Sequence, residues 1–308
     1  MRGRRREALE GYLFLAPALL IIGGFHVWPA LYAFYMSLFR WEIAQGAFVG
    51  LRNYQRLAVD GDFLRSVGLT VVYVIGTVPL EMAIGLGVAL LLHQRLRLRG
   101  AFRLVYFLPY VTSQVAVALV WDWVFNPTYG AANGMLTAAG APPLRWLLQP
   151  DGVFSRDAPP SLALASIMLV TVWYYLGFHA VVFLSGLTAI PDEILAAARI
   201  DGAAGLRLFR HITFPLLSPT TYFLLLIATI GAMTSFNLIY VLGGGSTTAG
   251  CAGNPLGTTE VAALFVFNRF WCQTQLGYAS AAAFVLGFVI IAVTAANSRL
   301  FARRVFYA

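Results

Sequence analysis

Six long apolar runs, separated by shorter polar segments, dominate the pattern of the chain. They cover approximately residues 12–38, 67–92, 104–125, 161–187, 216–241 and 277–298. Each is long enough for a transmembrane helix, which needs about 20 apolar residues. In lipid, backbone polar groups must be satisfied within the spanning segment itself or a closed barrel. The pattern predicts an all-α membrane protein whose six transmembrane helices form one transmembrane domain over residues 1–308.

The first apolar run follows a basic segment, "MRGRRRE", of the kind that also opens secretory signals. However, this run continues through His26, Trp28 and Pro29 to Phe39 without an evident small-residue cleavage site. A signal core spans only about 7–15 residues. We therefore interpret the first run as a transmembrane helix.

The composition supports a membrane protein and argues against a nucleic-acid partner. Of the 308 residues, 59% are hydrophobic and 11% charged, whereas soluble domains are about 25% charged. The 21 basic residues are all arginine and outnumber the 13 acidic ones. In so apolar a chain, a basic excess reflects membrane topology. No nucleic-acid binding is expected.

The arginines fall unequally on the two sets of connections. One set holds 14 of them, namely Arg2, Arg4, Arg5, Arg6, Arg95, Arg97, Arg99, Arg103, Arg199, Arg207, Arg210, Arg299, Arg303 and Arg304. The alternate set holds seven, namely Arg40, Arg52, Arg56, Arg65, Arg145, Arg156 and Arg269. Because cytoplasmic loops carry the arginine excess, both termini and the segment 188–215 are predicted to be cytoplasmic.

That cytoplasmic segment has the local chemistry of two short helices. Pro191 suits a first helical position, and Asp192 and Glu193 complement the positive end of a helix dipole. "ILAAARI" is strongly helix-forming, and "DG" at 201–202 then ends the helix. "AAGLRLFRHI" offers a second short helix before Pro215. The pattern predicts two short helices joined at a glycine elbow. The alternative is an ordered loop that only connects two spans.

The order of residues in this segment resembles the coupling loop of ABC importer permeases. That loop reads E-A-A, followed three residues later by D-G-A and then by a spaced F, I and P. The matching residues are Ala197, Ala198, Asp201, Gly202, Ala203, Phe209, Ile212 and Pro215. The resemblance implies that the loop inserts into a groove of a cytoplasmic ATPase. Ala196 stands where the motif has glutamate, and Glu193, on roughly the same helical face, could substitute.

Four further blocks resemble the carbohydrate-importer branch of the same family, near its maltose-type and phosphoglycerol-type permeases. They are "FVGLRNYQRL" (48–57), "FLPYVTSQVAVALVWDWVFNPTYGAAN" (107–133), "VWYYLGFHAVVFLSGLTAIP" (172–191) and "FNLIYVLGGG" (236–245). The resemblance implies a type I ABC importer permease fold in the bacterial cytoplasmic (inner) membrane. It also implies an ATP-driven sugar or oligosaccharide importer. The partners would be a second permease, two copies of a cytoplasmic ABC ATPase and an external sugar-binding protein.

The chain lacks the motifs of the common hydrolytic sites. There is no G-x-x-x-x-G-K-[ST], no G-x-S-x-G, no H-E-x-x-H and no soluble stretch long enough for a catalytic domain. We therefore expect a transport subunit that is not an enzyme, with no metal and no cofactor of its own. ATP and Mg would be bound by the partner ATPase.

Polar and aromatic side chains inside spans three to five suggest where a sugar would pass. Sugars are bound by side chains that donate and accept hydrogen bonds and by aromatic faces. These spans carry Tyr110, Thr112, Gln114, Thr171, Trp173, Tyr174, Tyr175, Thr234, Ser235 and Asn237. Resemblance to the maltose-type binding positions selects Tyr110, Gln114, Thr171, Tyr174, Tyr175 and Thr234. The alternative for each hydroxyl is a bond to its own helix or to a neighbouring one.

Besides Asp122, which lies in "WDWVF" near the outer boundary and is expected to be solvated, other ionisable residues within the spans are Glu81, His26 and His179. A secondary transporter would use them as proton or ion carriers and would show inverted repeats or broken helix pairs in matching positions; no convincing repeat is present. We favour a structural role in which Glu81 meets an amide, a hydroxyl or an arginine. A glycerol-3-phosphate-type substrate would want arginine in the cavity. The interiors of spans three to five contain none, which favours a neutral sugar.

Cys251 and Cys272 are the two cysteines of the chain. Both fall in the connection between spans five and six, which is predicted to be external. Two thiols in an oxidising compartment that bracket a glycine-rich loop predict one disulfide closing a loop of about 20 residues. Free thiols buried under a docking protein are the alternative.

Overall fold

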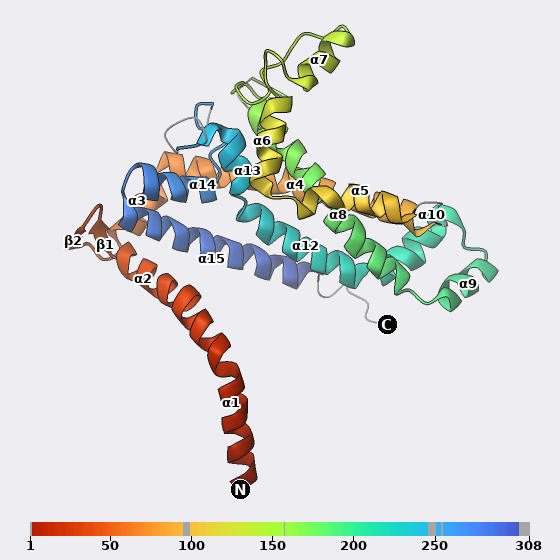
Figure 1. The fold of residues 1–308 in the computed structure, drawn as a ribbon, viewed down its shortest axis with the longest axis horizontal. Coiled ribbons are helices and arrows are strands. Elements are labelled where there is room, and N and C mark those ends of the chain that lie inside the picture. Colours follow the sequence, from red (N-terminus) through yellow and green to blue (C-terminus); the bar gives the residue numbers. More distant parts are fainter. Residues whose placement is uncertain (1, 95–98, 157, 246–250, 254, 302–308) are drawn as a thin grey trace. The chain divides into compact units, whose positions relative to one another are not determined.

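The computed structural model describes residues 2–94, 99–156, 158–245, 251–253 and 255–301 (Figure 1). Arg95, Arg97, Arg303 and Arg304, which entered the arginine count, lie outside these residues. Within them, five helices are long and apolar enough to cross a membrane, namely Gly11–Ser37, Gly61–His93, Leu162–Thr188, Ser218–Gly245 and Leu276–Phe301. The helix pair Gly100–Val111 and Gln114–Val124, bent by 97°, makes a sixth if the two helices together form one broken span. Five of the six predicted spans are confirmed as long apolar helices, and the third is a pair of helices with a sharp bend.

The contacts of the chain divide it into two compact units, which we describe separately. Unit 1 comprises Met1–Gly61 and Val266–Val285, and unit 2 comprises Asp62–Phe265 and Leu286–Ala308. The expectation of a single transmembrane domain, and of two cytoplasmic termini, stays a prediction.

Unit 1 is built from the first span and the segment that follows it. Helix α1 (Arg2–Ile22), a π-helical turn η1 (Gly23–Val27) and α2 (Trp28–Ser37) form the span. Strand β1 (Phe39–Trp41) pairs antiparallel with β2 (Gln45–Phe48), and α3 (Arg52–Val59) follows. The turn η4 (Asn268–Cys272) and the first part of α15 (Leu276–Phe301) complete the unit.

The block "FVGLRNYQRL" ties α3 to the end of the first span. The Asn53 side-chain amide donates to the backbone carbonyls of Ser37, at 2.8 Å, and Phe39, at 3.0 Å. Carbonyls at the end of a helix have no partner within the helix, so Asn53 satisfies one of them. The Tyr54 hydroxyl lies 2.7 Å from Ser37 Oγ, and Leu57 is 1% exposed. This block is therefore a structural clamp.

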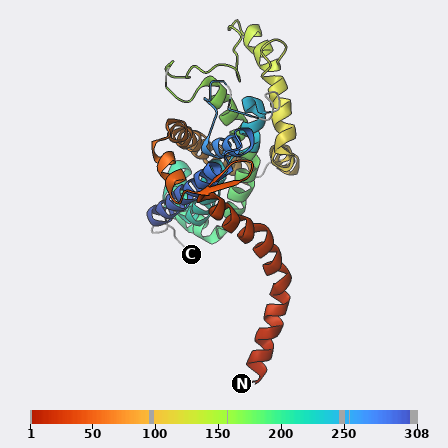
Figure 2. The same ribbon diagram turned by 90° about the vertical axis from the view of Figure 1, so that its left-hand side faces the viewer.

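Unit 2 carries most of the remaining helices. In chain order they are α4 (Gly61–His93), α5 (Arg99–Val111), α6 (Gln114–Val124), α7 (Ala131–Ala138), α8 (Leu162–Thr188), α9 (Asp192–Ile200), α10 (Gly205–Leu208), η2 (Phe209–Thr213), α11 (Phe214–Leu216), α12 (Ser218–Met233), α13 (Asn237–Tyr240), η3 (Val241–Gly245) and α14 (Ala262–Phe267). Figure 2 shows α5 nearly end-on while α6 runs away from it. The loop between α7 and α8 ends at Ser161, whose hydroxyl caps α8 by accepting from Leu164 N at 3.0 Å.

Helix α8 is the centre of unit 2, and glycines bring its neighbours close. A Cβ added at Gly85 of α4 would lie 2.6 Å from His179 Cβ. One at Gly177 would lie 2.8 Å from Phe107 Cα of α5, and one at Gly186 would lie 2.9 Å from Leu217 Cδ2. Small residues permit such backbone approach in membrane helices, where dispersion contacts drive packing. An apolar 18-residue window of α8 is accordingly 56% buried, more than that of the four other unbroken spans.

Candidate substrate path and coupling segment

The break between α5 and α6 lies next to Tyr110, the first residue of the candidate path. Pro109 lies inside α5 and removes one backbone donor, and the chain turns by 97° after Val111. The Tyr174 hydroxyl of α8 donates to two carbonyls at this break, Tyr110 O at 3.0 Å and Thr112 O at 3.2 Å. Tyr174, selected from the sequence as a sugar-binding residue, is buried and holds the broken helix in place.

Gln114, the first residue of α6, forms the centre of a hydrogen-bonded network. Its amide nitrogen donates to the Tyr175 hydroxyl at 2.9 Å, and its amide oxygen accepts from Asn237 Nδ2 at 2.9 Å. Asn237 is the first residue of α13, which follows a second break in the fifth span after Met233. The two helix breaks therefore meet through their side chains. Gln114 and Tyr175 are half-buried, and Asn237 is exposed.

Aromatic rings lie beside this network. The Tyr110 ring centroid lies 5.9 Å from that of Tyr175 and 5.8 Å from that of Tyr174. The Phe178 ring stacks on the Tyr110 ring, with 4.9 Å between their centroids. Apolar ring faces next to amide and hydroxyl groups suit the mixed surface of a sugar.

The two selected threonines have other surroundings. Thr171 is 2% exposed, donates to Ile167 O at 2.9 Å and lies 2.8 Å from the Tyr73 hydroxyl. Thr234 is exposed and donates to Ile230 O at 2.9 Å. Each thus bonds to its own helix, which is the alternative weighed for such residues. Of the six selected residues, Tyr110, Gln114, Tyr174 and Tyr175 come together.

Sequence reasoning passed over three residues that the structure adds. Asn237 was among the polar residues of the spans but was not selected, although it completes the Gln114 network. Tyr73 of α4 is fully buried, and its hydroxyl lies 3.2 Å from Ser235 Oγ as well as near Thr171. The sequence signal for Tyr73 was a tyrosine in the middle of the otherwise apolar stretch "TVVYVIG". Phe178 gave none beyond its place next to the tyrosines.

Glu81 and His179 face each other between α4 and α8. Glu81 Oε2 lies 3.9 Å from His179 Nε2, and the residues are 3% and 2% exposed. His179 Nδ1 lies 3.0 Å from Tyr175 O, while Nε2 has no hydrogen-bond partner. The expectation that Glu81 meets an amide, a hydroxyl or an arginine is wrong, because the glycine at 85 lets His179 approach instead.

The segment 188–215 forms the predicted helix pair. Helix α9 ends at Ile200, and Gly202 has the left-handed φ of +81°. Ala203 N donates to Ala198 O at 2.9 Å, and Gly202 N donates to Arg199 O at 3.1 Å. These two bonds make a Schellman motif, the turn that a glycine at this position favours. The elbow is confirmed, except that Pro191 caps α9 and Asp192 is its first residue.

Two large apolar side chains stand largely exposed on this helix pair. Ile200 is 87% exposed and Leu206 is 79% exposed, one on each side of Gly202. A cavity of about 450 Å³ lies between the helices, lined by Ile194, Ala197, Ala198, Asp201, Ala203, Arg207 and Ile212. Glu193 and Ala196 are both exposed on α9, Phe209 lies beside Phe214, and Pro215 lies in α11. The motif residues therefore lie together within the segment 188–215.

Cys251 and Cys272 are both disulfide-bonded, and neither is a free thiol. Across the residues that the structure describes, no group of three or more His, Cys, Asp and Glu side chains could hold a metal ion.

Comparison with known proteins identifies the family. Residues 81–307 match the model of the family described as binding-protein-dependent transport system inner membrane component. The chain belongs to this family. As such an inner membrane component, it is a multi-pass transport subunit and not an enzyme. The coupling-loop motif and the blocks at 107–133, 172–191 and 236–245 fall inside the matched residues, and the block at 48–57 lies before them.

The relatives of this inner membrane component are permeases of sugar and glycerol-phosphate ABC importers. The trehalose/maltose transport system permease protein MalF of Thermococcus litoralis is 35% identical, over 93% of this chain and 91% of the relative. The sn-glycerol-3-phosphate transport system permease protein UgpA of Agrobacterium fabrum is 32% identical, over 96% of each. The sulfoquinovosyl glycerol transport system permease protein SmoG of the same organism is 30% identical, over 96% of this chain and 91% of the relative.

The fold is shared with a solved importer. A bacterial ABC transporter involved in the import of the acidic polysaccharide alginate matches with a TM-score of 0.79 at 20% identity, over 98% of both chains. A second structure of an alginate transporter was solved with an alginate pentasaccharide-bound periplasmic protein. The type I importer permease fold is thereby confirmed. Broken helices were expected of a secondary transporter, but they occur here in two spans of a chain from the ABC importer family. Helix breaks therefore do not distinguish a secondary transporter from an ABC importer, whereas family membership does.

Proposed function

We propose that this permease lines one half of the path for a neutral sugar or oligosaccharide in an ATP-driven importer. The observation that carries the proposal is the Gln114 network, in which Tyr175 and Asn237 supply the other polar groups. Polar side chains at membrane depth are tolerated where they face water or protein. This network is only partly buried, so it needs such a surface beside it.

The charge of the surroundings favours a neutral substrate. No arginine occurs in α6, α8, α12 or α13, and the four grouped residues carry amides, hydroxyls and rings. A phosphate would be held by guanidinium or ammonium groups, because burying its charge without a partner is costly. The relatives are named for both kinds of substrate at similar identity, so identity alone does not decide between them.

The helix pair of segment 188–215 is proposed to dock into a groove of a cytoplasmic ATPase. Its exposed Ile200 and Leu206 supply apolar surface of the kind that marks a partner site. Glu193 would supply the carboxylate that Ala196 lacks. A second permease, two ATPase subunits and an external sugar-binding protein complete the proposed assembly, with both termini in the cytoplasm.

The test is substrate-stimulated ATP hydrolysis by the complete complex, purified with its partner permease, ATPase and binding protein. Neutral mono-, di- and oligosaccharides and sn-glycerol 3-phosphate would be compared in reconstituted vesicles. We expect stimulation by one or more neutral sugars and none by glycerol 3-phosphate. Stimulation by glycerol 3-phosphate alone would overturn the neutral-sugar assignment, and uptake driven by an ion gradient without ATP would overturn the mechanism.

A further inference from the structure

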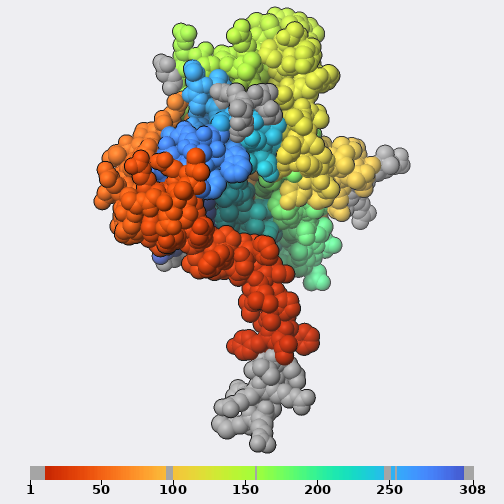
Figure 3. Space-filling view, turned by 60° about the vertical axis from the view of Figure 1, so that its left-hand side comes forward, coloured from red at the N-terminus to blue at the C-terminus, as the bar shows by residue number. Residues whose placement is uncertain are grey.

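Unit 1 contains a basic cavity that is separate from the residues of the proposed path. Its volume is about 550 Å³, and it is lined by Arg40, Trp41, Glu42, Val49, Arg52, Asn53, Arg56, Gln275 and Tyr278. Three guanidinium groups and one carboxylate line it, so the lining carries a net positive charge. Such a cavity suits an anionic group. Figure 3 shows the surface of residues 39–60 in orange.

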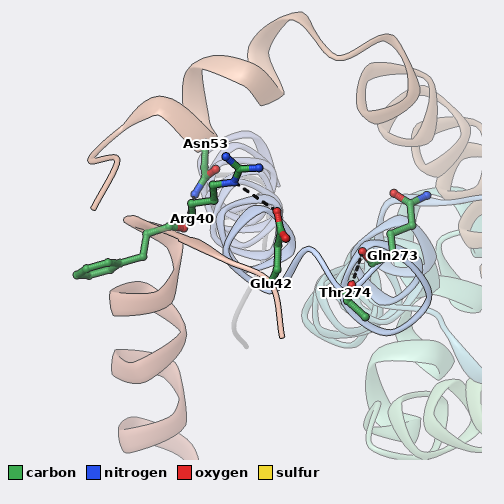
Figure 4. Close-up of polar contacts among 6 residues, drawn as sticks. Arg40, Glu42, Asn53, Gln273 and Thr274 are labelled. Carbon is green, nitrogen blue, oxygen red and sulfur yellow. Dashed lines mark hydrogen bonds and ion pairs between the residues drawn. The ribbon is translucent and has the colours of Figure 1, made fainter. Parts of the chain in front are cut away.

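The interactions among these residues leave positive charge available. Arg40 Nε lies 3.3 Å from Glu42 Oε1, and both side chains are largely exposed (Figure 4). An exposed ion pair of this kind contributes little to stability, so Arg40 can exchange Glu42 for an anionic ligand. Arg56 stacks over the Tyr278 ring, with 4.3 Å from its guanidinium carbon to the ring centroid. Arg52 is exposed at the start of α3 and forms no ion pair with the part of the chain that the structure describes.

The cavity lies where two spans end. Arg40 and Trp41 follow within four residues of Ser37, the last residue of the first span. Gln275 and Tyr278 flank Leu276, where the last span begins. Span ends lie in the polar region of a bilayer, where lipid phosphates are found and where Trp and Tyr are enriched. Because residues from both span ends line the cavity, we expect its arginines at headgroup depth.

The segment that carries these arginines, between the first span and α4, also exposes large apolar side chains, as expected of a surface in contact with lipid. Ile43 is 88% exposed, Phe48 66% and Leu51 64%. Basic residues together with exposed large apolar residues are typical of segments that lie in the membrane interface. Exposed apolar surface marks either a protein or a membrane contact, and its position between the ends of two spans favours the membrane here.

We propose that the cavity of unit 1 binds the phosphate of an anionic phospholipid headgroup, with Arg52 and Arg56 as its principal donors. Guanidinium groups bind phosphate oxygens in pairs of hydrogen bonds. Asn53 is not a donor to the lipid, because its amide already bonds to Ser37 and Phe39. The site fixes a lipid at the junction of the first and last spans.

The experiment titrates the purified importer complex with phosphatidylglycerol or phosphatidylcholine of identical acyl chains and counts retained lipids by native mass spectrometry. We expect preferential retention of phosphatidylglycerol. Arg52→Gln and Arg56→Gln should each weaken it about fivefold, the contribution of a basic residue near an anionic surface. Arg52→Lys should keep part of it. Arg145→Gln, which removes an exposed arginine of the loop before α8, should leave it unchanged.

Three outcomes would overturn the proposal. One is equal retention of both lipids by the wild-type complex. Another is displacement of the lipid by millimolar inorganic phosphate or glycerol 3-phosphate, which would indicate a site for a free phosphate ester. The third is unchanged lipid retention in the variants together with weaker binding of the external binding protein, which would make the arginines a docking site. Arg52→Gln avoids the packing role of Arg56, so loss of folding does not obscure the result.

Discussion

At the scale of single residues, the polar side chains of the spans fall into two groups that differ in their hydrogen-bond partners and exposure. Tyr174 and Thr171 direct their hydroxyls to backbone carbonyls, so their polar groups are used inside the protein. Gln114 and Tyr175 are partly exposed and bond to side chains, so they can exchange partners with a ligand. The accessible polar groups of the candidate path are therefore fewer than the polar residues of the spans.

Gln114 provides the sharpest test of the path. Gln114→Leu is close in size and removes an amide that serves both Tyr175 and Asn237. Loss of one buried hydrogen-bond partner costs about 1–3 kcal/mol, so sugar uptake per purified complex should fall about tenfold or more. Basal ATPase activity should be preserved. Gln149→Leu, a half-buried glutamine outside the spans, is the matched control. Lower melting temperature with unchanged normalised uptake would show that Gln114 only joins helices.

Glu81 and His179 should behave as a coupled pair. Removing one of two buried polar partners leaves the other without a neighbour to compensate its burial and costs about 1–3 kcal/mol, whereas replacing both by apolar residues can be nearly neutral. Glu81→Leu and His179→Leu should therefore each lower the apparent melting temperature of the complex, and the double variant should recover most of the loss. Additive losses in the double variant would show that the two side chains do not interact.

At the scale of elements, the residues proposed to act in transport and coupling lie at the ends of helices. The α5–α6 break presents Gln114, the break after α12 presents Asn237, and the Schellman turn after α9 presents the apolar side chains beside Gly202. Helix ends leave backbone groups without intrahelical partners, so each needs a specific side chain or turn. Tyr174 supplies this at the first break, and glycine supplies it in the coupling segment.

The elbow at Gly202 gives a prediction for coupling. A Cβ there meets nothing within 4 Å, so the cost of substitution comes from the positive φ alone. Gly202→Val should misdirect α10 and reduce both transport and substrate-stimulated ATPase activity while the subunit still inserts. Gly202→Asn should retain most of both activities, because asparagine tolerates left-handed angles. Normal stimulated activity in Gly202→Val would remove the argument for the elbow.

At the scale of the whole molecule, two features organise the chain. Helix α8 gathers α4, α5 and α12 in unit 2 through close approaches at Gly85, Gly177 and Gly186. The disulfide-bonded Cys251 and Cys272 constrain the connection before the last span.

The disulfide can be tested chemically. Alkylation of the denatured, unreduced protein should label neither Cys251 nor Cys272, and labelling after reduction should reach both. Closing a loop of about 20 residues should stabilise the protein by roughly 3 kcal/mol, so the reduced form should melt at a lower temperature. Stoichiometric labelling without reductant would show two free thiols.

The sequence by itself determined the spans and the coupling segment, because both depend on local properties. The length of each apolar run predicts a helix, and the order of residues around Asp201 and Gly202 predicts a glycine turn, without any knowledge of neighbours. The family motifs followed from the same local order. The resemblance also selected Tyr110, Gln114 and Tyr175, which the structure brings together.

Only the tertiary structure decided which polar groups meet. In a membrane span the lipid-facing side is as apolar as the packed side, so hydrophobic periodicity does not identify the buried face. Nothing local distinguishes Tyr174, whose hydroxyl closes a helix break, from Tyr175, whose hydroxyl is partly accessible. Likewise, Glu81 faces His179 because Gly85 lets α8 approach α4, and Asn237 reaches Gln114 because two spans break at the same level. These contacts depend on how helices cross, and crossing is set by steric fit between residues far apart in the chain.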